Sequence, residues 1–449
     1  MVARPGRTHR RLTPARAVAY RVVRRVTGDG AWADRAFRAE AERDELEPRE
    51  RAFAQQLAYG TVQRLRTLDH ALGAASSRTL DRVDPGLLDA LRLGAFQLLY
   101  LDGVPDHAAV EQTVELVKAE SPRASGFANA VMRRVARDGR AAVEAIEDST
   151  PGGAALKHSH PDWIARTWWE QLGPDAARAL MARDNEPPES AIRANELVTT
   201  RDDLAVAIGV PSHPAAGVPE GLVLEEPWDA HASPLFAQGA LTPQSRGSML
   251  VGRIVDPQPG ERVLDMCAAP GAKTTHMAAL MRGEGSLVAV EQHERRARAL
   301  VANCERMRAP SVEVIHADAR DSPAGPFDRI LLDPPCSDLG TLQSRPDVRW
   351  HKSPDLVERL AALQRELIDV ALERLAPGGV LVYSTCTISS PENEQQIDRV
   401  LAERPDVERD DLARDRPEVA HPHAGGYLQL LPHRDGADGF FISRLRRSV

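Results

Sequence analysis

Cysteine is scarce in this 449-residue chain, and long apolar runs are missing. The four cysteines form no C-x-x-C pair, and no spacing of Cys and His matches a zinc site, so we expect no metal. No stretch of about 18 uninterrupted apolar residues is present, which argues against a membrane span. No apolar segment follows the arginine-rich N-terminus, so a secretory signal is not expected. We therefore expect a cytoplasmic protein without disulfides.

Acidic residues are absent from residues 1–25, which carry eight arginines although the net charge of the chain is −8. Such a segment can follow a phosphate backbone or remain a solvated tail, and its charge alone leaves both open. We assign residues 1–11 to a basic arm. Lysine is rare as well, which makes Lys273, inside a loop of small residues, conspicuous.

The length favours two or three domains, because one hydrophobic core rarely extends over so long a chain. Residues 12–148 predict a helical bundle, since Val110, Val114 and Val117 recur at helical spacing behind the candidate cap Asp106. Residues 149–235 are rich in proline, with a helix predicted to open at 160–163 and a strand at 190–198. We interpret them as a small intermediate α/β subdomain.

Residues 236–449 alternate between strand and helix patterns. Strands are predicted at 262–266, 286–290, 312–316, 327–333 and 380–384, and helices begin near Thr274, Glu294 and Pro354. This alternation predicts a mostly parallel, Rossmann-like α/β sheet covered on both faces. Residues 427–431 and 440–445 flank a turn at 436–439, which predicts a terminal antiparallel hairpin.

A loop of small residues joins the first of these strands to a helix. Small residues let a ligand approach the backbone, and the helix N-terminus favours negative charge. The pattern is neither G-x-G-x-x-G nor G-x-x-x-x-G-K-[ST], so neither a dinucleotide nor a triphosphate is indicated. The candidate cofactor loop comprises Cys267, Ala268, Ala269, Pro270, Gly271, Ala272 and Lys273.

Acidic residues follow the next two strands. Glu291 ends the second strand, where a carboxylate suits the two hydroxyls of a ribose. Asp318 follows the third, where it can accept a hydrogen bond from the amine of an adenine. Together with the loop they predict an adenosine-containing cofactor, and S-adenosyl-L-methionine suits a sheet with a terminal hairpin.

Two cysteines end apolar runs, Cys336 after Asp333-Pro334-Pro335 and Cys386 after Ser384-Thr385. Both should emerge at the carboxyl edge of the sheet, where ligands bind in open α/β folds. A lone cysteine is more often a buried small hydrophobe, as we expect for Cys304, but two thiols beside Asp333 suggest covalent chemistry.

Methylation of cytosine at C5 needs these groups. A thiolate adding at C6 makes C5 nucleophilic, an acid near N3 favours the addition, and a base removes the C5 proton. Cys386, Asp333 and a group near Cys336 could supply the three parts. The base would have to leave its stack to reach them.

Residues 236–449 resemble the Sun/Fmu-type RNA cytosine-5 methyltransferases. The matching segments are Gln244-Ser245, the cofactor loop, Asp333-Pro334-Pro335-Cys336-Ser337, Arg345-Pro346-Asp347, Ser384-Thr385-Cys386-Thr387, Pro391-Glu392-Asn393-Glu394 and Asp438-Gly439-Phe440-Phe441. The resemblance implies that Cys386 is the nucleophile and that Cys336 assists release of the methylated base. It implies that Asp333 contacts cofactor and base. DNA cytosine-5 methyltransferases use the Pro-Cys thiol instead, so DNA is not expected as a substrate.

Residues of about 12–140 are similar to the NusB-like RNA-binding bundle. The matching segments are Arg51-Ala52-Phe53-Ala54, Tyr59-Gly60, residues 104–110 and residues 128–134. The combination resembles the bacterial enzymes that make 5-methylcytosine in 16S ribosomal RNA. It implies a monomer that takes 16S rRNA before the small subunit is fully assembled, with Arg345 and the intermediate subdomain lining the path of the RNA.

Three positions depart from the family pattern. Ala272 stands where a second glycine is usual, Glu291 where Asp is frequent, and Asp338-Leu339-Gly340 where Gly-Thr-Gly is usual. None of these changes removes a reactive group.

Three other functions stay open. Asp-Pro-Pro followed by an aromatic marks N-methyltransferases, but Cys336 holds the aromatic position here. A non-catalytic NusB-like RNA-binding or antitermination factor would leave the thiols and the loop without a task. A cytosine-5 methyltransferase of transfer RNA, or of another rRNA position, would share every motif.

Overall fold

The computed structural model describes residues 12–449, and the basic arm predicted at residues 1–11 lies outside them. The chain divides into two compact units. The helical unit runs to Glu186 and also includes Arg345–His351, whereas the sheet unit comprises Pro187–Ser344 and Lys352–Val449.

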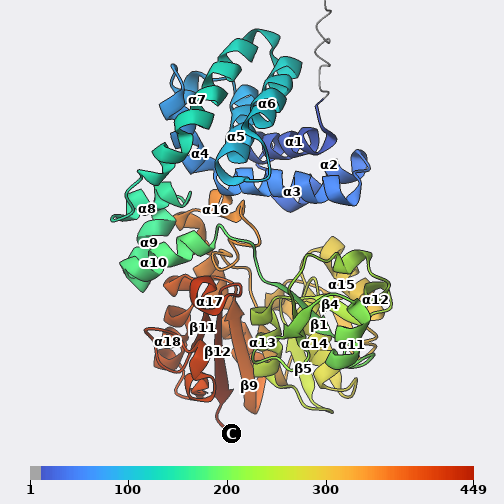
Figure 1. Cartoon of the computed structure of the whole chain (residues 1–449). Helices are drawn as coiled ribbons and strands as arrows, with labels where there is room; N and C mark the ends of the chain where they lie inside the picture. Colours follow the sequence, from blue (N-terminus) through green and yellow to red (C-terminus); the bar gives the residue numbers. More distant parts are fainter. Residues whose placement is uncertain (1–11) are drawn as a thin grey trace, which may run out of the picture. The chain divides into compact units, whose positions relative to one another are not determined.

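Between residues 12 and 186 the helical unit contains ten α-helices, shown from blue to green in Figure 1. They are α1 (Pro14–Asp29), α2 (Ala33–Arg43), α3 (Pro48–Gln63), α4 (Leu65–Ala75), α5 (Pro85–Tyr100), α6 (Asp106–Glu120), α7 (Ser125–Glu144), α8 (Pro151–Lys157), α9 (Asp162–Leu172) and α10 (Pro174–Arg183). Residues 12–186 contain no strand, which confirms the predicted bundle.

Helix α5 is central to the bundle, because twelve of its sixteen residues are buried. Pro85 takes the first turn, and the Asp84 carboxylate caps the helix by accepting from the backbone nitrogens of Gly86 and Leu87 at 2.9 and 3.2 Å. Helices α1, α3, α4, α6 and α7 pack around it. The sequence therefore both starts this helix, through its cap, and buries it at the centre of the bundle.

Arginines of the basic N-terminal segment that fall within α1 are paired inside the helical unit. Arg21 Nε lies 2.7 Å from a Glu40 carboxylate oxygen, and Arg24 and Arg25 lie 3.3 Å from Asp89 and Glu40. Within α1 the basic segment is therefore an ion-paired helix, whereas its charge alone left a phosphate-tracking arm and a solvated tail open.

A short segment from much later in the chain completes the helical unit. It contains α16 (Val348–His351). The Asp347 carboxylate accepts from the backbone nitrogen of Ala33 at 2.8 Å, and Trp350 Nε1 donates to the carbonyl of Val62 at 2.8 Å. Arg345, predicted to line the RNA path, stacks over the Trp32 ring at 5.5 Å.

The sheet unit begins with a small antiparallel sheet in the order β2-β3-β1-β4. Its elements are β1 (Ser190–Ala194), α11 (Arg201–Ile208), β2 (Ser212–Pro214), β3 (Gly221–Leu224), α12 (Pro234–Ala237) and β4 (Leu241–Pro243). The predicted intermediate α/β segment is present, although helices α8 to α10 group with the helical unit. The domain limits at 148/149 and 235/236 stay predictions.

The main sheet has the order β10-β12-β9-β8-β5-β6-β7, with β11 paired to β12. Its elements are α13 (Arg246–Val255), β5 (Arg262–Asp265), α14 (Ala272–Leu280), β6 (Ser286–Glu291), α15 (Glu294–Arg306), β7 (Val312–His316), β8 (Phe327–Leu332), α17 (Pro354–Arg374), β9 (Leu375–Thr385), α18 (Glu394–Glu403), β10 (Val407–Arg409), α19 (Leu412–Asp415), β11 (Leu428–Leu430), α20 (Pro432–Asp435) and β12 (Phe440–Arg447).

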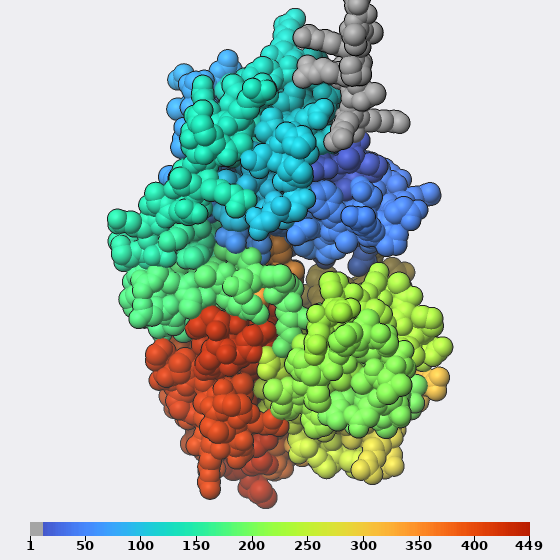
Figure 2. Space-filling view, viewed as in Figure 1, coloured from blue at the N-terminus to red at the C-terminus, as the bar shows by residue number. Residues whose placement is uncertain are grey.

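Strands β5 to β9 are parallel, and β12 runs antiparallel to β9, β10 and β11. Leu264, Val288 and Ile330 are almost fully buried, because helices cover both faces of the parallel strands. The predicted α/β sheet and terminal antiparallel hairpin are confirmed. Figure 2 shows the yellow-green residues that precede β5 beside the red C-terminal residues, and Gly247 of α13 packs on the Phe440 ring.

Within residues 12–449, no helix is both long and apolar enough to cross a membrane.

Candidate active site

The two predicted thiols meet at the carboxyl ends of the neighbouring parallel strands β8 and β9. Cys336 follows β8 by four residues and Cys386 follows β9 directly. Their sulfur atoms lie 3.4 Å apart, with Cys336 buried and Cys386 half-buried. The backbone nitrogen of Gly340 donates to the carbonyl of Cys386 at 3.0 Å and joins the two loops. The sheet therefore places both thiols at one point, as the strand ends predict.

A buried hydrogen-bond network fixes the loops behind the thiols. The backbone nitrogen of Ser337 donates to Glu392 Oε1 at 2.9 Å, and Gln364 Nε2 donates to the same oxygen at 3.1 Å. The hydroxyls of Ser337 and Thr387 lie 2.6 Å apart. Burial raises the pKa of Glu392. Such a buried network holds the loops in one geometry.

Asp338 reaches both sulfur atoms. Its Oδ1 lies 3.2 Å from Cys386 Sγ and 3.9 Å from Cys336 Sγ, and its Oδ2 accepts from Lys352 Nζ at 2.9 Å. The two sulfur atoms and one carboxylate oxygen of Asp338 all lie within 4.8 Å of one another, a spacing that a bound cation would also need. Because the ammonium of Lys352 already balances Asp338, we interpret the cluster as an acid–thiol network.

The Cys386 thiol is held in its neutral form. The pKa of Cys386 is well above its usual value, because the Cys336 thiol, burial and the nearby carboxylates of Asp338 and Asp333 all disfavour the thiolate. A thiol in this state needs a base when it reacts.

Asp333 lies at the end of β8, where two side chains orient its carboxylate. Lys273 Nζ donates to Oδ2 at 2.7 Å, and Ser384 Oγ donates to Oδ1 at 2.8 Å. The Lys273 ammonium also lies 5.2 Å from the centre of the Phe440 ring. Lys273 thus connects the predicted cofactor loop to the predicted acid.

The predicted cofactor loop runs from the end of β5 into α14. Gly271 has φ +99°, a conformation that favours glycine, and a Cβ there would meet Leu300 Cδ1 at 2.5 Å. Ala272 begins α14 in ordinary helical conformation, so the departure from a second glycine costs no backbone strain. A small hollow at this loop is lined by Asp265, Cys267, Ala268, Ala269, Pro270, Ala272, Lys273 and Asp333.

Glu291 and Asp318 lie at the ends of β6 and β7, beside this loop. Glu291 accepts from the backbone nitrogen of His293 at 2.8 Å. Arg296 Nη2 lies 3.5 Å from Glu291 Oε2 and donates to the carbonyl of Ala269 at 2.6 Å. Asp318 accepts from Arg320 Nε at 3.0 Å and Nη2 at 2.9 Å, and this pairing lowers its pKa. A buried carboxylate and a small-residue loop suit an adenosine-containing cofactor.

Four residues around these groups were not predicted as site residues. Asp265 lies under the loop, where burial raises its pKa to about 7, and it accepts from Thr274 Oγ1 at 2.7 Å. Asp338, Lys352 and Glu392 contact the thiols or their loops. The scarcity of lysine was a usable signal, since two of the four lysines, Lys273 and Lys352, pair with carboxylates here.

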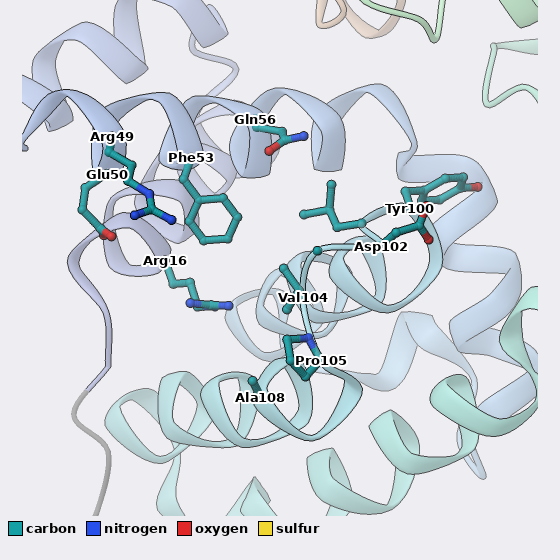
Figure 3. Close-up of a pocket in the computed structure, with 12 residues that line it drawn as sticks. Arg16, Arg49, Glu50, Phe53, Gln56, Tyr100, Asp102, Val104, Pro105 and Ala108 are labelled. Atoms are coloured by element: carbon teal, nitrogen blue, oxygen red, sulfur yellow. The ribbon is translucent and has the colours of Figure 1, made fainter.

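A separate hollow of about 650 Å³ lies in the helical unit (Figure 3). Arg16 of α1 and Arg49 and Phe53 of α3 line one side, and Tyr100 and Val104 line the other. The Arg16 guanidinium lies 5.2 Å from the centre of the Phe53 ring, and burial lowers the pKa of Arg16. Cationic and aromatic groups thus share one concave surface, which the carboxylates of Glu50 and Asp102 also line.

Family models match three parts of the chain. Residues 253–446 match the 16S rRNA methyltransferase RsmB/F model, residues 13–137 match the NusB family, and residues 160–231 match the ferredoxin-like domain of RsmF/B-like methyltransferases. The first range covers the main sheet, the second covers α1 to α6 and part of α7, and the third covers α9, α10 and strands β1 to β3.

Relatives match over nearly the full length. A protein of Synechocystis sp. named "Probable ribosomal RNA small subunit methyltransferase B" is 34% identical, over 97% of this chain and 99% of its own. The Ribosomal RNA small subunit methyltransferase B of Pseudomonas putida is 32% identical, over 90% of this chain and 92% of its own. The crystal structure of PH0851 matches with a TM-score of 0.81 at 25% identity, over 97% and 99% of the two chains. The chain belongs to the RsmB/F family of 16S rRNA methyltransferases.

Proposed function

We propose that this protein methylates C5 of a cytosine in 16S ribosomal RNA through a covalent bond between Cys386 and C6. The observation that carries the proposal is the 3.4 Å approach of Cys386 and Cys336 sulfur atoms beside Asp333. An N-methyltransferase would leave Cys386 without a task, whereas addition to C6 uses it.

Each group has a separate role in this reaction. Cys386 adds to C6 and makes C5 nucleophilic. Asp333, fixed by Lys273 and Ser384, faces the N3 edge of the cytosine and favours the addition. Once C5 carries its methyl group, a group near Cys336 removes the C5 proton, and Cys336 assists the breaking of the bond between Cys386 and C6. The base leaves its stack to enter the site.

S-adenosyl-L-methionine, when bound, supplies the methyl group. The loop from Cys267 to Lys273 would hold it together with Glu291, Asp318 and Asp333. The buried carboxylate of Glu291 at the end of β6 suits the ribose hydroxyls. The Arg320 side chain already pairs with Asp318, so an adenine amine would share or replace that pairing.

We infer that the helical unit takes the RNA. Its hollow combines Arg16 and Arg49 with Phe53 and Tyr100, and cationic and aromatic groups suit phosphates and unstacked bases. The names of the relatives support 16S rRNA as the substrate. A transfer RNA or another rRNA position is the second candidate, because the same motifs would serve it.

Trapping with RNA that contains 5-fluorocytosine tests the chemistry. Fluorine cannot leave as a proton does, so the wild-type enzyme should remain bound to the RNA as a denaturant-stable adduct. Cys386→Ala should form no adduct and should not transfer methyl groups. Cys336→Ala should form an adduct with unmodified RNA and release it slowly. Methyl transfer by Cys386→Ala at the wild-type rate would refute the proposal.

Bisulfite sequencing of ribosomal and transfer RNA from a deletion strain tests the substrate. We expect one cytosine of 16S rRNA to lose its methylation and to regain it when the wild-type gene is restored. Loss at a transfer RNA position would favour the second candidate. Loss at no position in either RNA would reject the assignment of RNA cytosine methylation.

A further inference from the structure

The feature that carries a further inference is the placement of Asp338. This residue has φ +57°, a left-handed conformation that Asp and Asn tolerate better than most residues. The backbone nitrogen and hydroxyl of Thr341 donate to its carbonyl at 3.0 and 2.9 Å and hold the turn. The turn aims the Asp338 carboxylate at Cys386.

Lys352 fixes the carboxylate from the other side. Its ammonium contacts Asp338 Oδ2 at 2.9 Å and the carbonyl of Cys336 at 3.2 Å. Both side chains are largely buried, at 20% exposure for Asp338 and 9% for Lys352. With Oδ2 engaged by Lys352, Oδ1 remains directed at Cys386 Sγ, 3.2 Å away. The three side chains form a line from ammonium to carboxylate to thiol.

We propose that Asp338 is the general base that takes the thiol proton of Cys386, an assignment that rests on the proposed cytosine-5 chemistry. The S–H proton moves to Asp338 Oδ1 while the sulfur forms its bond to C6. The π electrons of the C5–C6 bond move to C5 and into the ring. At the end of the cycle a base near Cys336 removes the C5 proton, the electrons of that C–H bond restore the C5–C6 double bond, and the departing sulfur takes its proton back from Asp338.

Other groups near the thiols are less suited to this task. The two oxygens of Asp333 accept from Lys273 and Ser384, and Glu392 is engaged by Ser337 and Gln364. Cys336 is a neutral thiol whose own proton would have to leave first. The titratable groups that face the Cys386 sulfur are Cys336, Asp338 and Asp333, with Lys273, Lys352 and Glu392 behind them.

The neutral thiol explains why a base is needed and why a carboxylate is useful in two ways. In the absence of RNA, the charge of Asp338 opposes ionisation of Cys386 and keeps the thiol unreactive. During addition the same carboxylate receives the proton, because the sulfur becomes acidic as it forms its bond to carbon. A group that only shapes the pocket would not do both.

Asp338→Asn and Asp338→Gly test the proposal, and both residues tolerate a positive φ, so the loop should keep its fold. The first measurement is the rate at which iodoacetamide modifies Cys386 in the free enzyme at pH 7.5, read by peptide mass spectrometry. The second is the rate of adduct formation with 5-fluorocytosine RNA across pH 6 to 9.

We expect the two rates to move in opposite directions. Alkylation of Cys386 should become several-fold faster, because loss of the neighbouring negative charge lowers the pKa of the thiol. Adduct formation at pH 7 should become about 100-fold slower and should rise with hydroxide concentration, as for a reaction without its base. A matched control is Asp355→Asn, an exposed residue of α17, which should alter neither rate.

Other outcomes overturn the assignment. If both variants form the adduct at the wild-type rate, or if alkylation and adduct formation slow together, Asp338 is not the base. This failure is distinct from that of the proposed function, which would show as a wild-type enzyme that forms no adduct at all.

Discussion

Arg349 of α16 donates from Nη1 to the carbonyl of Ser159, 3.1 Å away, across a separation of 190 residues in the chain. The same nitrogen contacts Asn185 Oδ1 at 3.1 Å, and Nη2 contacts the carbonyl of Asp184 at 3.3 Å. Arg349 is fully buried, and burial lowers its pKa to about 10. A segment that follows the Cys336 loop in sequence is therefore a structural part of the helical unit.

Arg349→Met should destabilise the helical unit. The methionine keeps the length of the side chain but leaves buried carbonyls without their donor, which should lower the free energy of unfolding by about 3 kcal/mol. Calorimetry should show the thermal transition of the helical unit at a lower temperature. Arg137→Met is the control, because the Arg137 side chain is exposed on α7 and should leave that transition where it is. An unchanged transition in Arg349→Met would show that these hydrogen bonds contribute nothing.

The sequence was sufficient to predict the parallel strands and the meeting of the two cysteines. The strand Ser286–Glu291 carries a short apolar run bounded by turns, so its pattern predicts it almost to the residue. Strand order then places the ends of β8 and β9 side by side, which brings Cys336 to Cys386. Local pattern and topology are enough for this part of the site.

The segment around α16 and the role of Asp338 could not be predicted in this way. The contacts of Arg349 and Trp350 join residues more than 150 positions apart, and no local pattern records such partners. The position of the Asp338 carboxylate depends on a left-handed turn, and the surrounding loops define that turn. Both depend on tertiary contacts, which periodicity does not carry.

Asp265→Asn should remove part of the pH dependence of stability. Burial raises the pKa of Asp265 to about 7, so between pH 5 and pH 7 the folded state keeps a proton that the unfolded state has released. The free energy of unfolding should therefore fall by about 2 kcal/mol as pH rises through this range. Asparagine cannot ionise but can still accept from Thr274, so urea titrations should show the variant without that decrease. Equal slopes for both proteins would mean that Asp265 is not protonated at pH 5.

Arg49→Ala should weaken RNA binding without affecting cofactor binding. Arg49 is an exposed cation at the hollow of the helical unit, and a lost phosphate contact reduces the salt dependence of binding by about one unit of slope. Fluorescence anisotropy with a 16S rRNA fragment at several salt concentrations measures this slope. Arg137→Ala, an exposed arginine outside the hollow, is the matched control. If the slope is the same in all three proteins, the RNA does not contact this surface through Arg49.

Lys352→Met should make Cys386 less reactive in the free enzyme, the reverse of Asp338→Asn. The ammonium of Lys352 offsets the charge of Asp338, so its removal should raise the pKa of the thiol further and slow alkylation by iodoacetamide several-fold. In a protein that already carries Asp338→Asn the carboxylate is absent, so adding Lys352→Met should have little effect on the alkylation rate. A cycle of the four proteins therefore measures the coupling between the two residues at the thiol. If Lys352→Met slows alkylation equally with and without the Asp338 carboxylate, Lys352 does not act on the Cys386 thiol through Asp338.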